Sequence, residues 1–169
     1  MNPQQDADSW LEVRRDERLD QRSLHSLRAF SAGDTLVTFR AAATFAHPAR
    51  LTLQVSESEH IELAPAALTF INHGCEPNTA FDMERWALIA LRPIASGDPI
   101  TAFYPSTEWT MAEPFDCHCG SPRCLGKVSG ASQLPARALQ GHRLAPHIQA
   151  LLQQAGAQVL PGSERPNEP

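Results

Sequence analysis

The chain has no long hydrophobic run and no block of basic residues. Of its 169 residues, 14 are lysine or arginine and 19 are aspartate or glutamate, which gives a net charge of −5. A membrane-spanning helix needs about 20 consecutive apolar residues, and the sequence has no such run. Binding to a phosphate backbone depends on clustered basic side chains. We therefore expect no membrane partner and no direct nucleic acid binding, whereas a mildly acidic surface suits a basic peptide.

The N-terminal residues also lack the features of a secretory signal. The segment 1–8 has neither a basic region nor an apolar one. We therefore expect a cytoplasmic protein, or a nuclear or chromatin-associated one if the source is eukaryotic. The sequence contains no internal repeats, and its length is most simply one domain with tails. Polar composition predicts disordered tails at 1–9 and 161–169.

Cysteine is scarce too, and its four positions are informative. Cys117, Cys119 and Cys124 lie in one short run, and Cys75 lies far upstream. Two disulfides are one alternative, but a pair separated by a single residue reaches disulfide geometry poorly. Unliganded thiols are the second alternative, although a Gly-Ser-Pro-Arg loop is a turn and not a core element. Tetrahedral zinc takes four thiolates, so we predict that these four cysteines bind one zinc ion. His118, between two of them, is a weaker candidate ligand.

Short runs that alternate apolar and polar residues dominate the rest of the sequence. Period two at 51–55 and 61–63, on either side of a polar turn, predicts a hairpin with one buried face. The apolar run 86–91 predicts a strand covered on both faces. We also expect strands at 11–13, 35–39 and 100–104, a short helix at 65–70, and an amphipathic helical extension over 131–160 broken by Gly141 and Pro146. The fold class is therefore mainly β.

Three motifs, in order along the chain, resemble the SET-domain protein-lysine methyltransferases. Asn72-His-Gly-Cys-Glu-Pro-Asn78 is similar to the family's Asn-His-Ser-Cys-x-Pro-Asn signature and departs from it at Gly74. The segment 94–104 resembles the stretch that ends in the family's catalytic tyrosine, and 117–126 resembles its post-SET zinc loop. The resemblance implies a SET domain over 10–113 and a post-SET loop over 114–130. The implied fold is a SET-type β-clip of several short sheets with a threaded pseudo-knot, a zinc-bound post-SET loop and a C-terminal helical tail.

The resemblance also implies S-adenosylmethionine as methyl donor and a lysine-containing protein or peptide as acceptor. Methyl transfer needs a neutral amine and a narrow, dry channel, because alignment and desolvation supply most of the advantage. The implied roles are catalysis by Tyr104, the only tyrosine, and a fourth zinc bond from Cys75. The implied donor-binding residues are Asn72, His73, Ser23, Leu24, His25, Phe115 and Leu125, and the implied channel residues are Ala102, Phe103 and Trp109.

Each of these residues also has a purely structural interpretation. A tyrosine that closes a strand is often a half-buried core residue, and Asn72 with His73 is compatible with a hydrogen-bonded turn. Aromatic residues such as Phe103 are core residues by default. Alanine at position 102, where the family carries phenylalanine or tyrosine, leaves room in the channel and predicts di- or trimethylation.

The sequence departs from the family at the start of the donor site. The family has a Gly-x-Gly strand there, and this chain has Gln21 and Ser23 in the two glycine positions. Glycine lets a backbone approach a ligand closely, so the donor sits differently or Ser23 makes a contact that glycine does not. The insert between the two halves of the domain is also short. Two alternatives follow, namely an inactive, zinc-stapled peptide-binding module and a methyltransferase of small-molecule amines. The sequence does not indicate the oligomeric state.

Overall fold

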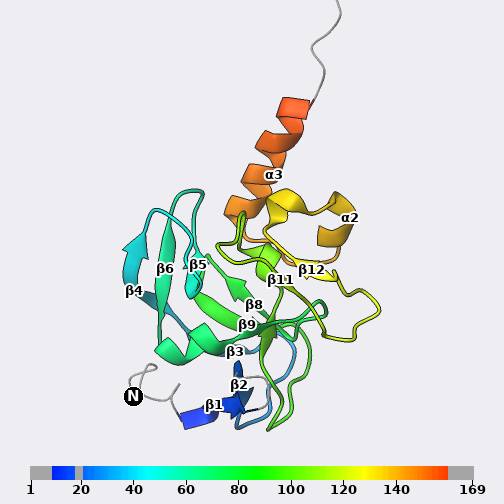
Figure 1. Ribbon diagram of the computed structural model, residues 1–169. Helices are drawn as coiled ribbons and strands as arrows, with labels where there is room; N and C mark the ends of the chain where they lie inside the picture. Colours follow the sequence, from blue (N-terminus) through cyan, green and yellow to red (C-terminus); the bar gives the residue numbers. More distant parts are fainter. Residues whose placement is uncertain (1–8, 18–20, 160–169) are drawn as a thin grey trace, which may run out of the picture.

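Residues 9–17 and 21–159 are described by a computed structural model (Figure 1). Over this part of the chain the strands are short and form five small sheets. The mainly β fold predicted from the sequence is therefore confirmed. The expected tails at 1–9 and 161–169 lie outside the described residues, apart from Ser9. No helix within 9–17 or 21–159 is long and apolar enough to cross a membrane.

Two three-stranded antiparallel sheets supply most of the core. In the first, β9 (Ala87–Ala90) lies between β3 (Thr35–Thr38) and β8 (Thr79–Asp82), and every residue of β9 is buried. The strand expected to be covered on both faces is thus confirmed. In the second, β6 (His60–Ala64) lies between β4 (Arg40–Phe45) and β5 (Thr52–Gln54). The β5–β6 pair is the predicted hairpin, and within it Ile61 and Leu63 are buried while Glu62 between them is exposed.

Among the strands that were not expected from the sequence are β2 (Gln21–Ser26) and β4. The strand β2 pairs antiparallel with β1 (Leu11–Asp16), and β4 pairs with β6. Both have few large apolar side chains, and in β2 only Leu24 and Ser26 are buried. Their extended conformation depends on pairing with a neighbouring strand, which a local pattern does not encode.

A parallel pair of very short strands brings together two segments that are distant in the sequence. Asn72 and His73 of β7 (Asn72–His73) lie opposite Thr101 and Ala102 of β10 (Thr101–Ala102). The helix expected before β7 is the 3-10 helix η1 (Ala66–Phe70). A Cβ added to Gly74 would lie 3.1 Å from the Thr101 side chain, so a larger residue here would require that side chain to move by a few tenths of an ångström.

The strand expected over 100–104 ends at Ala102. Tyr104 instead opens the 3-10 helix η2 (Tyr104–Ser106), and its carbonyl accepts the N–H groups of Thr107 and Glu108 at 3.0 Å each. Pro105 has no N–H to donate to a sheet, so the chain leaves the strand at this point. The turn places residues 107 and 108 close behind the tyrosine.

The C-terminal part folds back onto this turn. The strands β11 (Phe115–Asp116) and β12 (Lys127–Val128) close the cysteine loop, followed by η3 (Ala131–Gln133), α2 (Ala136–Leu139) and α3 (Pro146–Val159). The chain breaks at Gly141, with φ of 80°, and α3 starts at Pro146, as predicted. Ala145 N–H donates to the Ser106 carbonyl at 2.8 Å. Figure 1 shows α3 projecting from the body of the molecule.

Gly130 is required by a close approach of two backbones. A Cβ at this position would overlap the Trp109 carbonyl and lie 2.5 Å from Thr110 Cα. We expect Gly130→Ala to lower the free energy of unfolding by about 1–3 kcal/mol or more, because backbone atoms have to move. Gly156→Ala is the matched control, since nothing lies within 4 Å of its added Cβ and alanine favours helix. Urea unfolding of both variants checks this, and equal midpoints would contradict it.

Candidate active site and metal centre

Tyr104 lies in the wall of a cavity of about 690 Å³. The walls come from β2, β5, η1, β7, β10, η2 and the segment before β11, so residues distant in sequence share one space. Of the residues predicted for the site, Asn72, Ala102, Tyr104 and Phe115 line this cavity. The parallel β7–β10 pair brings the first three of them together.

The Tyr104 hydroxyl is held as a hydrogen-bond donor. It donates to the Ile71 carbonyl at 2.7 Å. Its ring makes edge contacts with His73, at 5.4 Å between centroids, and with Phe115 at 6.1 Å. Burial, together with the nearby charge of Glu108, raises the pKa of Tyr104 to about 12. The hydroxyl therefore stays protonated at neutral pH.

His73 links the backbone of Tyr104 to Cys75. The Tyr104 N–H donates to His73 Nδ1 at 3.2 Å, so the imidazole proton lies on Nε2, which is 3.2 Å from Cys75 Sγ. Burial lowers the pKa of His73 to about 4, and the ring is neutral at pH 7. His73 therefore acts through hydrogen bonds to its neighbours, and it does not itself line the cavity.

In the predicted donor segment, the residues that line this cavity are not the ones named from the sequence. Ser23 Oγ lies 2.9 Å from His25 Nε2, and His25 Nδ1 lies 3.0 Å from the Gly97 carbonyl. Leu24 is fully buried in the main core. None of these three lines the cavity, whereas Gln21 and Arg22 do. Arg22, between Gln21 and Ser23, thus lines the cavity together with its neighbour Gln21.

Asn72 links β7 to β2 at the edge of the cavity lined by Arg22. Its Nδ2 donates to the Arg22 carbonyl at 3.0 Å. The Arg22 guanidinium lies over the Phe70 ring, 5.1 Å from its centroid. The segment that lacks the two glycines is therefore still attached to the signature and still forms a wall.

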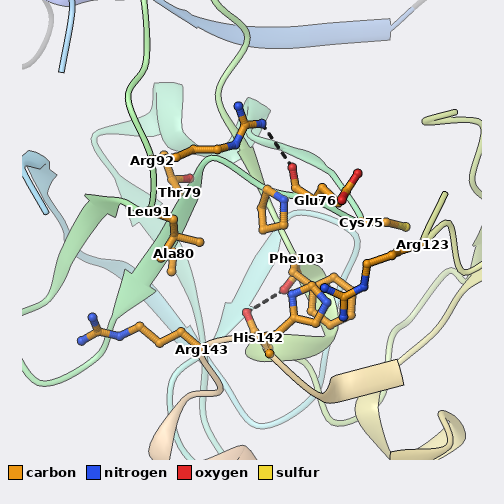
Figure 2. A pocket seen from close by; sticks show the side chains of 13 residues that line it. Cys75, Glu76, Thr79, Ala80, Leu91, Arg92, Phe103, Arg123, His142 and Arg143 are labelled. Carbon is orange, nitrogen blue, oxygen red and sulfur yellow. Dashed lines mark hydrogen bonds between the residues drawn. The ribbon is translucent and has the colours of Figure 1, made fainter. Parts of the chain in front are cut away.

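The expected channel residues lie on two sides of the chain. Ala102 and Tyr104 line the cavity, but Phe103 faces a second cavity of about 680 Å³ (Figure 2). There its ring stacks on His142, with centroids 3.6 Å apart and planes 2° from parallel. Trp109 packs, like Leu125, against a second hydrophobic cluster around Phe103. Alternation along extended backbone separates Phe103 from its two neighbours, and the sequence pattern contained this signal.

Glu108 lies in the cavity wall and was not singled out from the sequence. Its Oε1 accepts the Gln54 N–H at 2.9 Å and the Thr107 hydroxyl at 3.4 Å. Burial raises the pKa of Glu108 from 4.5 to about 7. The signal available in the sequence is an acidic residue only four positions after the tyrosine.

The raised pKa of Glu108 predicts a pH-dependent stability. Between pH 4.5 and about 7 the folded protein holds a proton here that the unfolded chain has lost, so stability falls as pH rises through this window. Glu108→Gln keeps the acceptor oxygen and cannot ionise. We expect it to be more stable than the wild type by up to about 3 kcal/mol at pH 8, with a much smaller difference at pH 5. Urea unfolding across this range checks the sign, and a difference independent of pH would contradict it.

The four cysteines form one cluster, as predicted. Their Sγ atoms all lie within 4.8 Å of one another, and Cys75 and Cys117 are 3.9 Å apart. A tetrahedral zinc with bonds of about 2.3 Å to sulfur needs sulfur separations of about 3.8 Å, so the donor set and its size fit zinc. His118 is not part of the cluster.

Backbone and ring N–H groups surround the sulfur atoms. Leu125 N–H donates to Cys75 Sγ at 3.3 Å, and Gly126 N–H donates to Cys124 Sγ at 3.5 Å. Such N–H···S bonds stabilise and orient thiolate ligands. Burial raises the pKa of Cys75 to about 12, so a thiolate at this position needs a cation beside it. The cluster thus joins the C-terminal loop to the segment that contains His73.

The chain is similar to a known protein family and to proteins named as methyltransferases. The family model described as the SET domain matches residues 12–105. The methyltransferase flvH of Aspergillus flavus is 36% identical over 148 residues, which cover 86% of this chain and 82% of that protein. The histone-lysine N-methyltransferase ash1 of Drosophila melanogaster is 35% identical over 72 residues, which cover 38% of this chain and 3% of that protein.

Two solved structures share the fold. The crystal structure of KRYPTONITE in complex with mCHG DNA and SAH has a TM-score of 0.52 and 21% identity, and the match covers 69% of this chain and 28% of that one. A second KRYPTONITE structure, with mCHH DNA, an H3(1-15) peptide and SAH, has a TM-score of 0.52 and 22% identity, covering 69% of this chain and 29% of that one.

Proposed function

Because this chain belongs to the SET-domain family, we propose that it is an S-adenosylmethionine-dependent lysine N-methyltransferase acting on a protein or peptide. The observation that supports this most is the junction at Tyr104. Its hydroxyl donates a hydrogen bond to the Ile71 carbonyl, and its backbone N–H donates one to His73 Nδ1. Tyr104 and Asn72 line the same cavity. One residue thus connects the family signature, the cysteine cluster and the space for the reactants. The histone H3 peptide in a KRYPTONITE structure supports a peptide acceptor.

The residues around the cavity fit a methyl donor and an amine. Bound S-adenosylmethionine supplies an electrophilic methyl group. Asn72 and Arg22 form one wall, and Phe115, which is 38% exposed, offers an aromatic ring at another. The Tyr104 hydroxyl stays protonated and orients the reacting groups. Apolar residues such as Ala102 and Phe81 exclude water and lower the pKa of a buried amine.

The test begins with the donor. Calorimetry of the purified protein with S-adenosylmethionine and with S-adenosylhomocysteine should show one binding site for each. Labelled methyl transfer is then measured into a histone H3 peptide of residues 1–15 and into a whole lysate, followed by peptide mapping. Absence of donor binding would reject the proposal and favour the inactive peptide-binding module.

A small-molecule amine is the second candidate acceptor. The Aspergillus flavus relative, of which the chain covers 82%, is named a methyltransferase with no protein substrate in its name. The cavity wall also contains a carboxylate, Glu108, which suits a compact cation. Free lysine and simple aliphatic amines, assayed beside the H3 peptide, separate the two candidates.

Ala102 predicts how many methyl groups are added. It is buried and lines the cavity, and its methyl side chain leaves space beside Tyr104 for a methylated amine. We expect the wild type to produce di- or trimethylated lysine and Ala102→Tyr to shift the product towards monomethyl-lysine. Mass spectrometry at long reaction times measures the ratio. Only monomethyl product from the wild type would mean that another side chain, such as Phe81, closes the space.

A further inference from the structure

Glu108 is a carboxylate that the fold holds rigidly beside the catalytic tyrosine. It is only 8% exposed, and its N–H donates to the Tyr104 carbonyl at 3.0 Å. Its Oε1 accepts the backbone N–H of Gln54, whose own side chain accepts the Trp109 N–H at 2.8 Å and donates to the Ser56 carbonyl at 2.8 Å. The segment after η2 and the strand β5 are thus joined by two hydrogen bonds, one donated by each of them. The position of the carboxylate in the cavity wall is therefore fixed.

Within residues 9–17 and 21–159, no cationic side chain forms an ion pair with this carboxylate, that of Glu108. The other charged or titratable groups that line the cavity are Arg22, Arg50, Glu113 and Tyr104. Arg22 lies over Phe70, and Arg50 is 3.7 Å from Glu113. Burying an ionised carboxylate without a cation costs free energy. A cation that enters the cavity would therefore stabilise the ionised form of Glu108.

We propose that Glu108 binds the ammonium group of the acceptor amine and accepts its proton before methyl transfer. The inference rests on the proposed function. One N–H proton of the ammonium passes to the carboxylate, which leaves a neutral amine with a lone pair. The lone pair forms the N–C bond to the donor methyl as the S–C bond breaks, and the electron pair of that bond stays on sulfur as S-adenosylhomocysteine forms. The carboxylic proton later returns to solvent.

A buried site lowers the free-energy cost of this proton transfer. Burial raises the pKa of Glu108 to about 7 and lowers that of an amine from its usual value of about 10.4. The two values move towards each other, so the neutral pair becomes accessible where an exposed pair would stay ionised. The substrate class is an aliphatic amine that still carries an N–H when protonated. Lysine and its mono- and dimethyl forms satisfy this, as do small primary, secondary and tertiary amines.

The experiment compares three variants with the wild type. Glu108→Gln removes the charge and keeps the shape, Glu108→Asp keeps the charge, and Glu62→Gln removes an equivalent charge from an exposed position on β6. Transfer of labelled methyl is measured from pH 6 to 9, with the H3(1–15) peptide and with free lysine as acceptors. Donor affinity is measured by calorimetry and folding by thermal melting.

We expect the wild-type kcat/KM to fall below an apparent pKa near 7. Glu108→Gln should lose this acid limb, raise KM for the amine and lower kcat by about 10²–10⁴-fold, with unchanged donor affinity. Glu108→Asp should retain the limb, and Glu62→Gln should match the wild type. Glu108→Gln with a wild-type rate, or with a lower rate and the acid limb intact, overturns the inference while leaving the proposed function in place. A wild type that binds no donor overturns both.

Discussion

Replacing Tyr104 with phenylalanine is expected to reduce methyl transfer by about 10²–10³-fold. The hydroxyl is a fixed donor, 2.7 Å from the Ile71 carbonyl, and a pKa near 12 keeps it protonated. Its loss removes a hydrogen bond that aligns the reacting groups, and leaves the Ile71 carbonyl without that donor. The stability cost of one such bond is about 1 kcal/mol, so the fold persists.

The rate and donor affinity of Tyr104→Phe separate catalysis from structure. Single-turnover transfer should be slow, whereas calorimetry should give nearly wild-type affinity for S-adenosylmethionine. Thermal melting controls for folding. Transfer at the wild-type rate would show that Tyr104 is only a packed residue of the cavity wall.

Removal of zinc is expected to disrupt folding and donor binding together. The purified protein should contain one equivalent of zinc, since the four sulfur atoms already lie within 4.8 Å of one another. Cys75→Ser should lose the metal and loosen the segment 115–128, because the cluster joins this loop to β7. Structural zinc contributes on the order of 10 kcal/mol in small domains, and the loss here should lower the melting temperature strongly.

His118→Ala is the matched control for the cysteine variant. It lies between two ligands, in the same loop, but outside the cluster of sulfur atoms. We expect it to retain one zinc and wild-type donor affinity. Elemental analysis and calorimetry measure both quantities. A folded, donor-binding protein without metal would reject the zinc assignment, and loss of zinc in His118→Ala would revise the ligand set.

The His142–Phe103 stack shows how the C-terminal extension reaches the active site. His142 comes from the turn after α2, and its partner directly precedes Tyr104. His147 Nε2 also lies 2.7 Å from the Thr107 carbonyl. The extension therefore packs on the η2 turn that carries both Tyr104 and Glu108. The sequence predicted its helices but gave no sign of this contact.

The sequence by itself determined those features whose causes are local. Period two predicted β5 and β6, and a short apolar run predicted β9. Gly141 with Pro146 predicted the break before α3, because backbone preferences act within a few residues. The four cysteines identified their own cluster, since few other arrangements satisfy tetrahedral thiolate ligation. The motifs around Cys75 and Tyr104 identified the family in the same way.

Only the tertiary structure decided which side chains share the cavity. Ser23 and His25 form a hydrogen bond with each other, whereas Arg22 lines the cavity. The pairing of β2 with β1 sets this orientation of the strand. Glu108 enters the same space because the chain turns at Pro105 and its carboxylate meets Gln54, 54 positions earlier in the sequence. The sequence pattern specifies which residues of a strand share a face. Which of the two faces lines the cavity depends on pairing with strands that are distant in the sequence.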